Sequence, residues 1–192
     1  MRDLNDLFER LAGSRRLLLL LYLLYAKKGE PIKGVLWLQG EMFVIWRALN
    51  TDDRYYSINY LKSLLNDIDY LINLNLVEGN MEGIYRITQK GKMLVDYLIE
   101  KNIIYKLLGR KTLDIIEDVK NLLNDLGRDE LLGYIYFNYP ESIEKSEEFK
   151  RIEREKVRIT IQLFKKGKIS LERTSEILDI PIEELIRMIK RL

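Results

Sequence analysis

Residues 73–98 hold the pattern that most limits the fold, a short hairpin signal set between two helical signals. The run LVE leads to the turn-forming residues GNMEG, and IYRIT follows at once, rich in β-branched and aromatic residues. Tyr85 and Ile87 alternate with Arg86, so one face of this strand can pack inward while the other stays in water. Helical spacing resumes after Thr88, a residue type that caps helices. The sequence therefore predicts a two-stranded hairpin between helices.

Three helical patterns precede the hairpin. We expect a helix over residues 14–26 that Ser14 caps and that the segment KKGEPI ends. A second helix is expected over about 32–49, and its apolar residues lie on more than one side. Such a helix is either deep in the core or shared with a partner, and the sequence leaves both open. Ser57 is placed to cap a third helix that runs to about residue 75.

Further helical patterns follow the hairpin. One helix begins after Thr88, and a second is expected from a cap at Thr112 to a stop at Gly127. A short aromatic helix ends at Pro140, and the charge-rich residues after it predict a solvated connecting helix. Residues 150–192 then predict a compact helical unit. The chain is therefore expected to be mainly α.

Charge and composition limit the classes of function. The chain has 192 residues, with 32 Lys or Arg against 30 Asp or Glu and a net charge of +2, so any contact with nucleic acid must be local. Cysteine and histidine are both absent. This excludes disulfides, zinc sites made of those residues and catalysis by a histidine or cysteine. The Lys, Glu and Ile content favours a thermophile source, although the many Asn residues argue against it.

The run LLLLLYLLYA, residues 17–26, is apolar but shorter than the roughly 20 residues of a membrane span. Lys27 and Lys28 end it early, and the acidic residues before it do not suit a signal peptide. We expect a buried core helix, no membrane contact and a cytoplasmic protein.

The order of three helices and a hairpin resembles the winged-helix regulators of the PadR and MarR type over about residues 14–105. The exit from the third helix, Leu71 to Val77, carries Asn75 where the family favours glycine. The return from the hairpin matches the family pattern at Tyr85, Ile87, Thr88 and Gly91. The resemblance implies a winged helix, three helices plus a two-stranded wing, that regulates transcription by binding DNA as a dimer.

Other stretches resemble antitoxin families. PIKGVLWLQGEMF resembles the opening of the Panacea antitoxin domain, and DELLGYIYFNYPE is similar to a segment of its archaeal relatives. Residues 163–189 resemble a family of small antitoxin-like helix-turn-helix proteins, with Ser170 capping the middle helix and Pro181 starting the last. We therefore expect a winged-helix domain over 1–107, a helical connecting section over 108–149 and a small helix-turn-helix-like unit over 150–192.

A DNA-reading helix inserts its first residues into the major groove, with basic residues toward the phosphates. The third helix offers polar residues outward, and Asp67 and Asp69 are expected among them, two turns deeper. The predicted DNA contacts are Ser57, Asn59, Tyr60, Lys62 and Ser63 in the groove and Arg86, Lys90 and Lys92 on the backbone. Arg15, Arg16, Lys27, Lys28, Lys33 and Arg54 could add to a basic patch. The last helix of the chain begins with Glu183 and Glu184, which favours packing or partner binding there over DNA reading.

The alternative is a protein-binding module of the antitoxin kind, in which the winged helix is a scaffold. Its predicted partner contacts are Trp37, Val44, Tyr134 and Tyr136. An enzyme is not expected, because Asp67 and Asp69 face different directions on a helix and GRKTLD lacks the spacing of a phosphate-binding loop. We expect no metal and no cofactor. Either double-stranded DNA or a protein partner, and a homodimer, are the expected associations.

Overall fold

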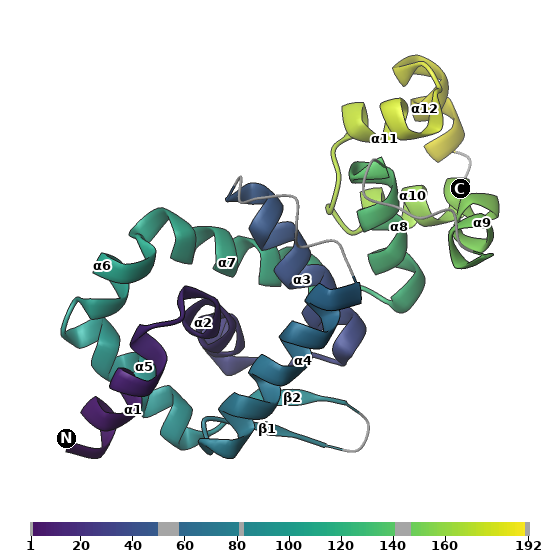
Figure 1. Cartoon of the computed structure of the whole chain (residues 1–192). Coiled ribbons are helices and arrows are strands. Elements are labelled where there is room, and N and C mark those ends of the chain that lie inside the picture. The colour runs from purple at the N-terminus through teal and green to yellow at the C-terminus, as the bar shows by residue number, and fades with distance from the viewer. Residues whose placement is uncertain (1, 50–57, 81–82, 141–146, 191–192) are drawn as a thin grey trace. The chain divides into compact units, whose positions relative to one another are not determined.

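The computed structural model of the chain describes residues 2–49, 58–80, 83–140 and 147–190 (Figure 1). Within these ranges the protein is mainly helical, as predicted, and carries one small antiparallel sheet. The chain divides into two compact units, Met1–Asn124 and Asp125–Leu192. This division falls inside the expected connecting section 108–149, whose first helix belongs to unit 1 and whose second belongs to unit 2.

Unit 1 is built around one helix. Its elements are α1 (Arg2–Ala12), α2 (Arg15–Gly29), α3 (Val35–Ala48), α4 (Ile58–Asn73), β1 (Val77–Gly79), β2 (Tyr85–Ile87), α5 (Gln89–Glu100), α6 (Ile103–Leu108) and α7 (Arg110–Leu123). Figure 1 shows α2 in the middle of this unit, and it contacts α1, α4, α5, α6, α7 and β2. Because neighbours lie on every side, the leucine run from Leu17 to Leu24 is buried throughout. The prediction of a core helix is confirmed. In the ranges that the structure describes, no helix has the length and apolar character to cross a membrane.

The connection from α2 to α3 differs from the prediction. The expected second helix begins at about residue 32, but α3 begins at Val35, and Ile32 forms an antiparallel bridge with Tyr85 instead. The Ile32 N–H donates to the Tyr85 carbonyl at 2.9 Å, and the Tyr85 N–H donates back at 3.0 Å. Pro31 disfavours helical backbone at the residue before it, and Glu30 is extended, with φ −54 and ψ 132. The chain therefore enters α3 from an extended segment held against the hairpin.

The hairpin is confirmed at the predicted place. Val77 pairs with Ile87, Glu78 with Arg86 and Gly79 with Tyr85. Asn80 shapes the turn, because its side-chain oxygen accepts the Ile84 N–H at 2.9 Å.

Both ends of the hairpin are fixed by local chemistry. Asn75 leaves α4 with φ 57, a left-handed conformation that asparagine tolerates, which explains an asparagine where glycine is usual. The Thr88 hydroxyl accepts the Gly91 N–H at 3.0 Å and so caps α5, as predicted, and it donates to the Asn75 carbonyl at 2.7 Å. A side chain at Gly91 would meet the Leu76 carbonyl oxygen at 2.2 Å, so this close approach requires glycine.

The predicted cap at Thr112 is wrong. The helix begins two residues earlier, at Arg110, after Gly109 turns the chain with φ 85. Thr112 is buried inside α7. The helix ends at Leu123 rather than near Gly127, because Asn124 closes it and turns its side chain to Glu30 and Pro31.

Unit 2 contains α8 (Arg128–Asn138), α9 (Glu147–Arg154), α10 (Lys156–Lys165), α11 (Leu171–Leu178) and α12 (Ile182–Ile189). α10 packs against α8 and α11, and α9 packs against α8. The charged helix α9 is therefore more than a solvated connector, because Ile152 on it is fully buried. The Ser170 hydroxyl accepts the Arg173 N–H at 3.1 Å, so the predicted cap of α11 is confirmed.

Candidate nucleic-acid interface

One face of α4 is polar and exposed. Its exposed residues are spaced to lie on one side of the helix: Lys62, Asn66, Asp69, Tyr70 and Asn73. The opposite side is buried and carries Leu64, Ile68 and Leu71. Ser63 is half-buried beside this polar face. Of the other predicted groove contacts, Ser57 and the side chains of Asn59 and Tyr60 lie outside the described residues.

An ion pair orients α4 in unit 1. Asp67 was expected to face outward, but it is only 8% exposed. Its carboxylate accepts a hydrogen bond from Arg16 Nη2 at 2.9 Å, and Arg16 Nε completes a two-pronged ion pair. Such forked pairs fix geometry as well as charge. Arg16 is thus committed to holding α4 against α2, and it is not available for the predicted basic patch.

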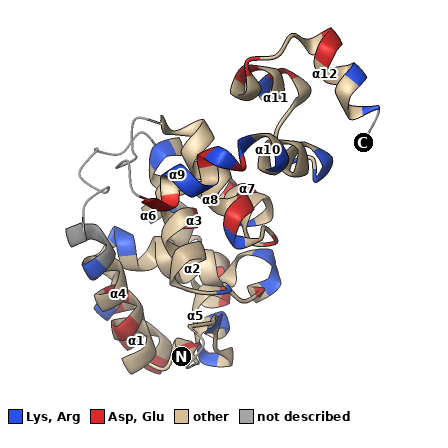
Figure 2. Cartoon of the chain, turned by 90° about the vertical axis from the view of Figure 1, so that its right-hand side faces the viewer, with Lys and Arg blue, Asp and Glu red and all other residues tan. Residues whose placement is uncertain are grey.

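The hairpin lies beside α4, since α4 packs against β1. Arg86 is exposed and stands opposite the exposed Glu78 in the strand register. Among the described residues of α4 and the hairpin the exposed charges balance, with Lys62 and Arg86 basic and Asp69 and Glu78 acidic, while the third acid, Asp67, is paired with Arg16. Figure 2 shows basic and acidic segments on the same helix α4. Any attraction of this face to phosphates therefore comes from individual side chains rather than a broad positive field.

The two predicted lysines of α5 are half-buried. Lys90 lies in the first turn of the helix. Lys92 packs on the end of α2, because a side-chain atom built on Gly29 would come within 2.8 Å of Lys92 Cε. Lys62 and Ser63 thus lie on α4, the helix that carries the polar face. Lys92 lies on α5 and is held against the end of α2.

Trp37 lies where the start of α3 meets the hairpin turn. The Lys33 ammonium is 5.9 Å from the centre of the Trp37 ring, within the range of a cation–π contact. A side-chain atom built on Gly34 would be 3.9 Å from the Gly83 carbonyl oxygen. Trp37 is half-buried there. Val44, the other apolar partner contact predicted on this helix, is 4% exposed and cannot contact a partner, because that side of α3 faces the core.

Unit 1 also contains a buried acid and a buried base, and sequence reasoning missed both. Glu41 on α3 and Lys120 on α7 are both 0% exposed. The Lys120 ammonium donates to the carbonyls of Leu23 at 2.8 Å, Leu24 at 3.3 Å and Ala26 at 3.0 Å, and so caps the end of α2. Cations are favoured at that end of a helix by its dipole.

Burial shifts the pKa of both groups. It raises the pKa of Glu41 to about 8, opposed by the charge of Lys120, and it lowers the pKa of Lys120 to about 8, opposed by the charge of Glu41. Neither oxygen of Glu41 accepts a hydrogen bond from the described residues. The protonated, neutral carboxyl group is therefore favoured well above its usual pH range.

Lys120 belongs to a polar row on α7 that holds the connection between α2 and α3. Glu117 accepts the Lys27 N–H at 2.9 Å, and Asn124 Nδ2 donates to Glu30 Oε1 and to the Pro31 carbonyl, both at 3.0 Å. The three α7 residues are spaced by three and four, so they lie on one helix face. That spacing, beside the buried Ile116, Val119 and Leu123, is the sequence signal that could have found them.

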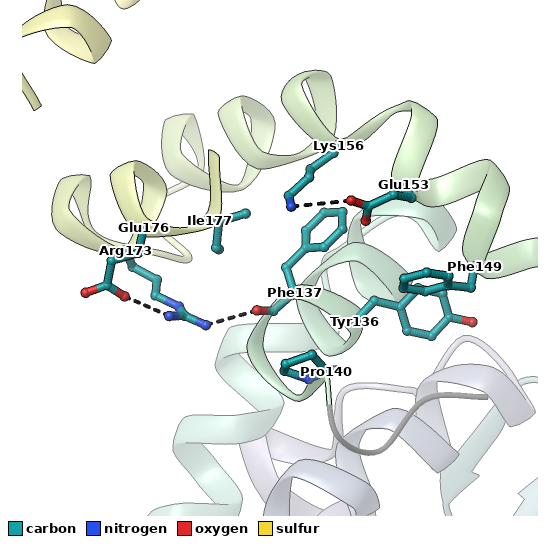
Figure 3. Close-up of a pocket in the computed structure, with 9 residues that line it drawn as sticks. All are labelled: Tyr136, Phe137, Pro140, Phe149, Glu153, Lys156, Arg173, Glu176 and Ile177. Atoms are coloured by element: carbon teal, nitrogen blue, oxygen red, sulfur yellow. Dashed lines mark hydrogen bonds and ion pairs between the residues drawn. The ribbon is translucent and has the colours of Figure 1, made fainter. Parts of the chain in front are cut away.

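Unit 2 carries a partly open pocket of about 400 Å³ (Figure 3). Tyr136 and Phe149 form one wall, with their ring centres 5.5 Å apart. Arg173 on the other side donates to the Phe137 carbonyl at 2.9 Å and to Glu176 at 2.7 Å. Of the two predicted tyrosine contacts, Tyr136 lines this pocket, whereas Tyr134 is half-buried and burial raises its pKa to about 12.

In the described ranges, no three acidic side chains are grouped so that they could hold a metal ion. Comparison with protein families, curated proteins and solved structures finds no match to this chain.

Proposed function

We propose that residues 14–105 form a winged-helix domain that binds double-stranded DNA, and that the protein is a cytoplasmic, non-enzymatic regulator of transcription. In this proposal α2, α3 and α4 are the three helices and the hairpin of β1 and β2 is the wing. The bridge between Ile32 and Tyr85 supports the proposal, because it joins the segment before α3 to the hairpin. The three helices and the hairpin are thereby connected in one unit.

The exposed polar face of α4 is the observation that carries the proposal. Its lysine, asparagine and aspartate suit the hydrogen-bonding edges of guanine, adenine and cytosine in the major groove. The Arg16–Asp67 ion pair presents this face outward, because it fixes the opposite side of α4 against α2.

The first test is DNA binding across a range of salt concentrations. We expect the affinity of the full chain for a random duplex, measured by gel shift or fluorescence anisotropy, to fall steeply as salt rises. Lys62→Ala should weaken binding several-fold and reduce the salt slope by about 1, because one phosphate or base contact is lost. Lys101→Ala, which removes an exposed lysine at the end of α5, is the matched control and should bind as the native chain does.

A base contact is distinguished from a phosphate contact by sequence preference. Duplexes that the native chain selects from a random pool should bind it more tightly than random DNA does. We expect the Asn66→Ala variant to bind the selected and the random duplexes with similar affinity. The same variant should keep the native salt slope, because asparagine carries no charge. Weak binding that does not depend on salt would refute the proposal.

Protein binding is the second candidate function. It is favoured by the balance of the exposed charges on α4 and the hairpin and by the exposed ring of Tyr70. If the protein binds a protein partner instead, Tyr70→Ser should abolish capture of that partner. The native chain should then show no salt-dependent DNA binding. Salt-dependent binding that Lys62→Ala weakens and Tyr70→Ser does not would decide for DNA.

A further inference from the structure

The end of α2 is a left-handed turn. Lys27, Lys28 and Gly29 follow one another with φ 53, 59 and 76, after extended backbone at Ala26. Glycine adopts left-handed backbone readily, whereas in other residues the Cβ atom comes too close to the following carbonyl oxygen. Two successive lysines in this conformation therefore require contacts from outside the turn.

The polar row on α7 provides these contacts. Glu117 accepts the Lys27 N–H at 2.9 Å, and its charge also favours the charged form of Lys120. Asn124 binds the two residues that follow the turn. Lys120 lies between them on the helix face and donates to the Ala26 carbonyl at 3.0 Å and to two earlier carbonyls of α2. Because hydrogen bonds from a charged donor are stronger than those from a neutral one, the ammonium group contributes most to holding the start of the turn.

Glu41 on α3 is a buried acid whose charge acts on the same ammonium group. α3 packs against α7, and the Glu41 carboxyl group is fully buried with no hydrogen-bond donor among the described residues. A buried carboxylate without a donor is costly, so Glu41 needs a donor once it ionises. Lys120 is the charge that attracts it most strongly. The other charges that face it are Lys27 and Lys33, which also attract it, and Glu30, which repels it.

We propose that Glu41 is the trigger of a pH-sensitive switch: while it is protonated, Lys120 holds the end of α2, and when it ionises, its carboxylate takes the ammonium group from the α2 carbonyls. Burial brings the pKa of both groups to about 8. Glu41 ionises first, because three carbonyl acceptors and the negative end of the helix dipole favour the charged form of Lys120. Above about pH 8 the turn Lys27–Gly29 is then free to relax, and with it the segment that leads to the bridge between Ile32 and Tyr85.

The first test follows backbone carbonyl carbons by NMR of the full chain as the pH is raised from about 6 to about 10. The resonance of a carbonyl carbon depends on the hydrogen bond that its oxygen accepts. We expect the resonances of Leu23, Leu24 and Ala26 to move together with the side-chain carboxyl resonance of Glu41, at one midpoint near pH 8. The Asn75 carbonyl, which accepts a hydroxyl group instead, is the internal reference and should stay in place. Carbonyl resonances that stay in place while the Glu41 carboxyl ionises would overturn the proposal, as would a Glu41 carboxyl that does not titrate within this range.

The second test removes the trigger. Glu41→Gln keeps the size of the side chain and removes its charge. We expect the transition of the three carbonyl resonances near pH 8 to disappear in this variant. It should remain in Glu100→Gln, the matched control at an exposed glutamate. A transition with the native midpoint in Glu41→Gln would assign it to proton loss from Lys120 and overturn the role of Glu41.

The third test produces the released state without a change of pH. Lys120→Met removes the ammonium group, so at about pH 6 we expect the Lys27 amide hydrogen to exchange about tenfold faster than in the native chain. A native exchange rate would show that the turn holds without Lys120 and would overturn the release step. If this variant does not fold, the exchange of the Lys27 amide in the native chain above the midpoint, compared with that in Glu41→Gln at the same pH, decides the point. None of these measurements requires DNA, so their outcome is independent of the function proposed above.

Discussion

At the scale of single residues, Glu41 has the largest expected effect on how stability depends on pH. Burial raises its pKa to about 8, from 4.5 for an exposed glutamate. Between these values the folded chain holds a proton that the unfolded chain releases. Stability from this group is therefore fully present below about pH 4.5 and is lost as pH rises toward 8. The lowered pKa of Lys120 acts with the opposite sign, and only above about pH 8.

Glu41→Gln should remove this loss. We expect the free energy of unfolding of the native chain to fall as pH rises from 5 to 8. The fall should be steeper than that of the variant by up to about 1.4 kcal/mol per pH unit. Urea unfolding at several pH values measures the two slopes. Glu100→Gln, at an exposed glutamate, is the control and should follow the native slope. Parallel curves for the native chain and Glu41→Gln would contradict the prediction.

Gly91 is a position where the closeness of a backbone carbonyl group leaves no room for a side chain. Gly91→Ala would place a methyl group 2.2 Å from the Leu76 oxygen, which accepts the Thr88 N–H at 3.0 Å. Because backbone rather than a flexible side chain would have to move, we expect a loss of about 3 kcal/mol in chemical denaturation. Gly13→Ala meets no atom within 4 Å and should change stability by less than about 0.5 kcal/mol. Equal stability of the two variants would show that the end of the hairpin can shift.

At the scale of elements, α7 holds the segment that joins α2 to α3 and that is bridged to the hairpin. Asn124→Ala removes both hydrogen bonds to Glu30 and Pro31, next to the bridge between Ile32 and Tyr85. We expect hydrogen exchange at the Ile32 and Tyr85 amides to become about tenfold faster, in line with the loss of about 1.4 kcal/mol of local stability. The Thr88 amide, which bonds to Leu76 at the other end of the hairpin, is the internal reference. Uniform acceleration at all three amides would mean that the unit as a whole had been destabilised.

The same elements show what the sequence could predict. The caps at Ser14, Thr88 and Ser170 were predictable, because each hydroxyl bonds to a backbone amide three residues further on. The hairpin was predictable because its turn and its two strands are contiguous in sequence.

Contacts between distant residues were not predictable in this way. Ile32 leaves the expected helix because its partner, Tyr85, lies in the hairpin, and Asp67 turns inward because of Arg16. Thr112 looked like a cap only because the turn at Gly109 was missed. The polar face of α4 was recognised at Lys62 and Asp69, and its role in binding DNA stays a prediction.

At the scale of the whole molecule, each unit has a core of its own. Leu18, Leu64 and Leu98 are buried in unit 1, and Leu131, Ile159 and Leu163 are buried in unit 2. We expect residues 1–124 and 125–192, expressed separately, each to unfold cooperatively in a circular dichroism melt. Residues 1–124 should also retain salt-dependent DNA binding, and residues 125–192 should show none. A fragment that fails to unfold cooperatively would show that its core needs the other unit.

The cap that Lys120 places on α2 also sets an order of events during synthesis. The carbonyl groups of Leu23, Leu24 and Ala26 receive their donor from a residue 94 to 97 positions later. A nascent chain that has left the ribosome only as far as α5 therefore has its central helix without the ammonium group that completes it. The native arrangement of unit 1 is reached only after α7 has emerged, because Lys120 on α7 supplies the hydrogen bonds that complete the end of α2.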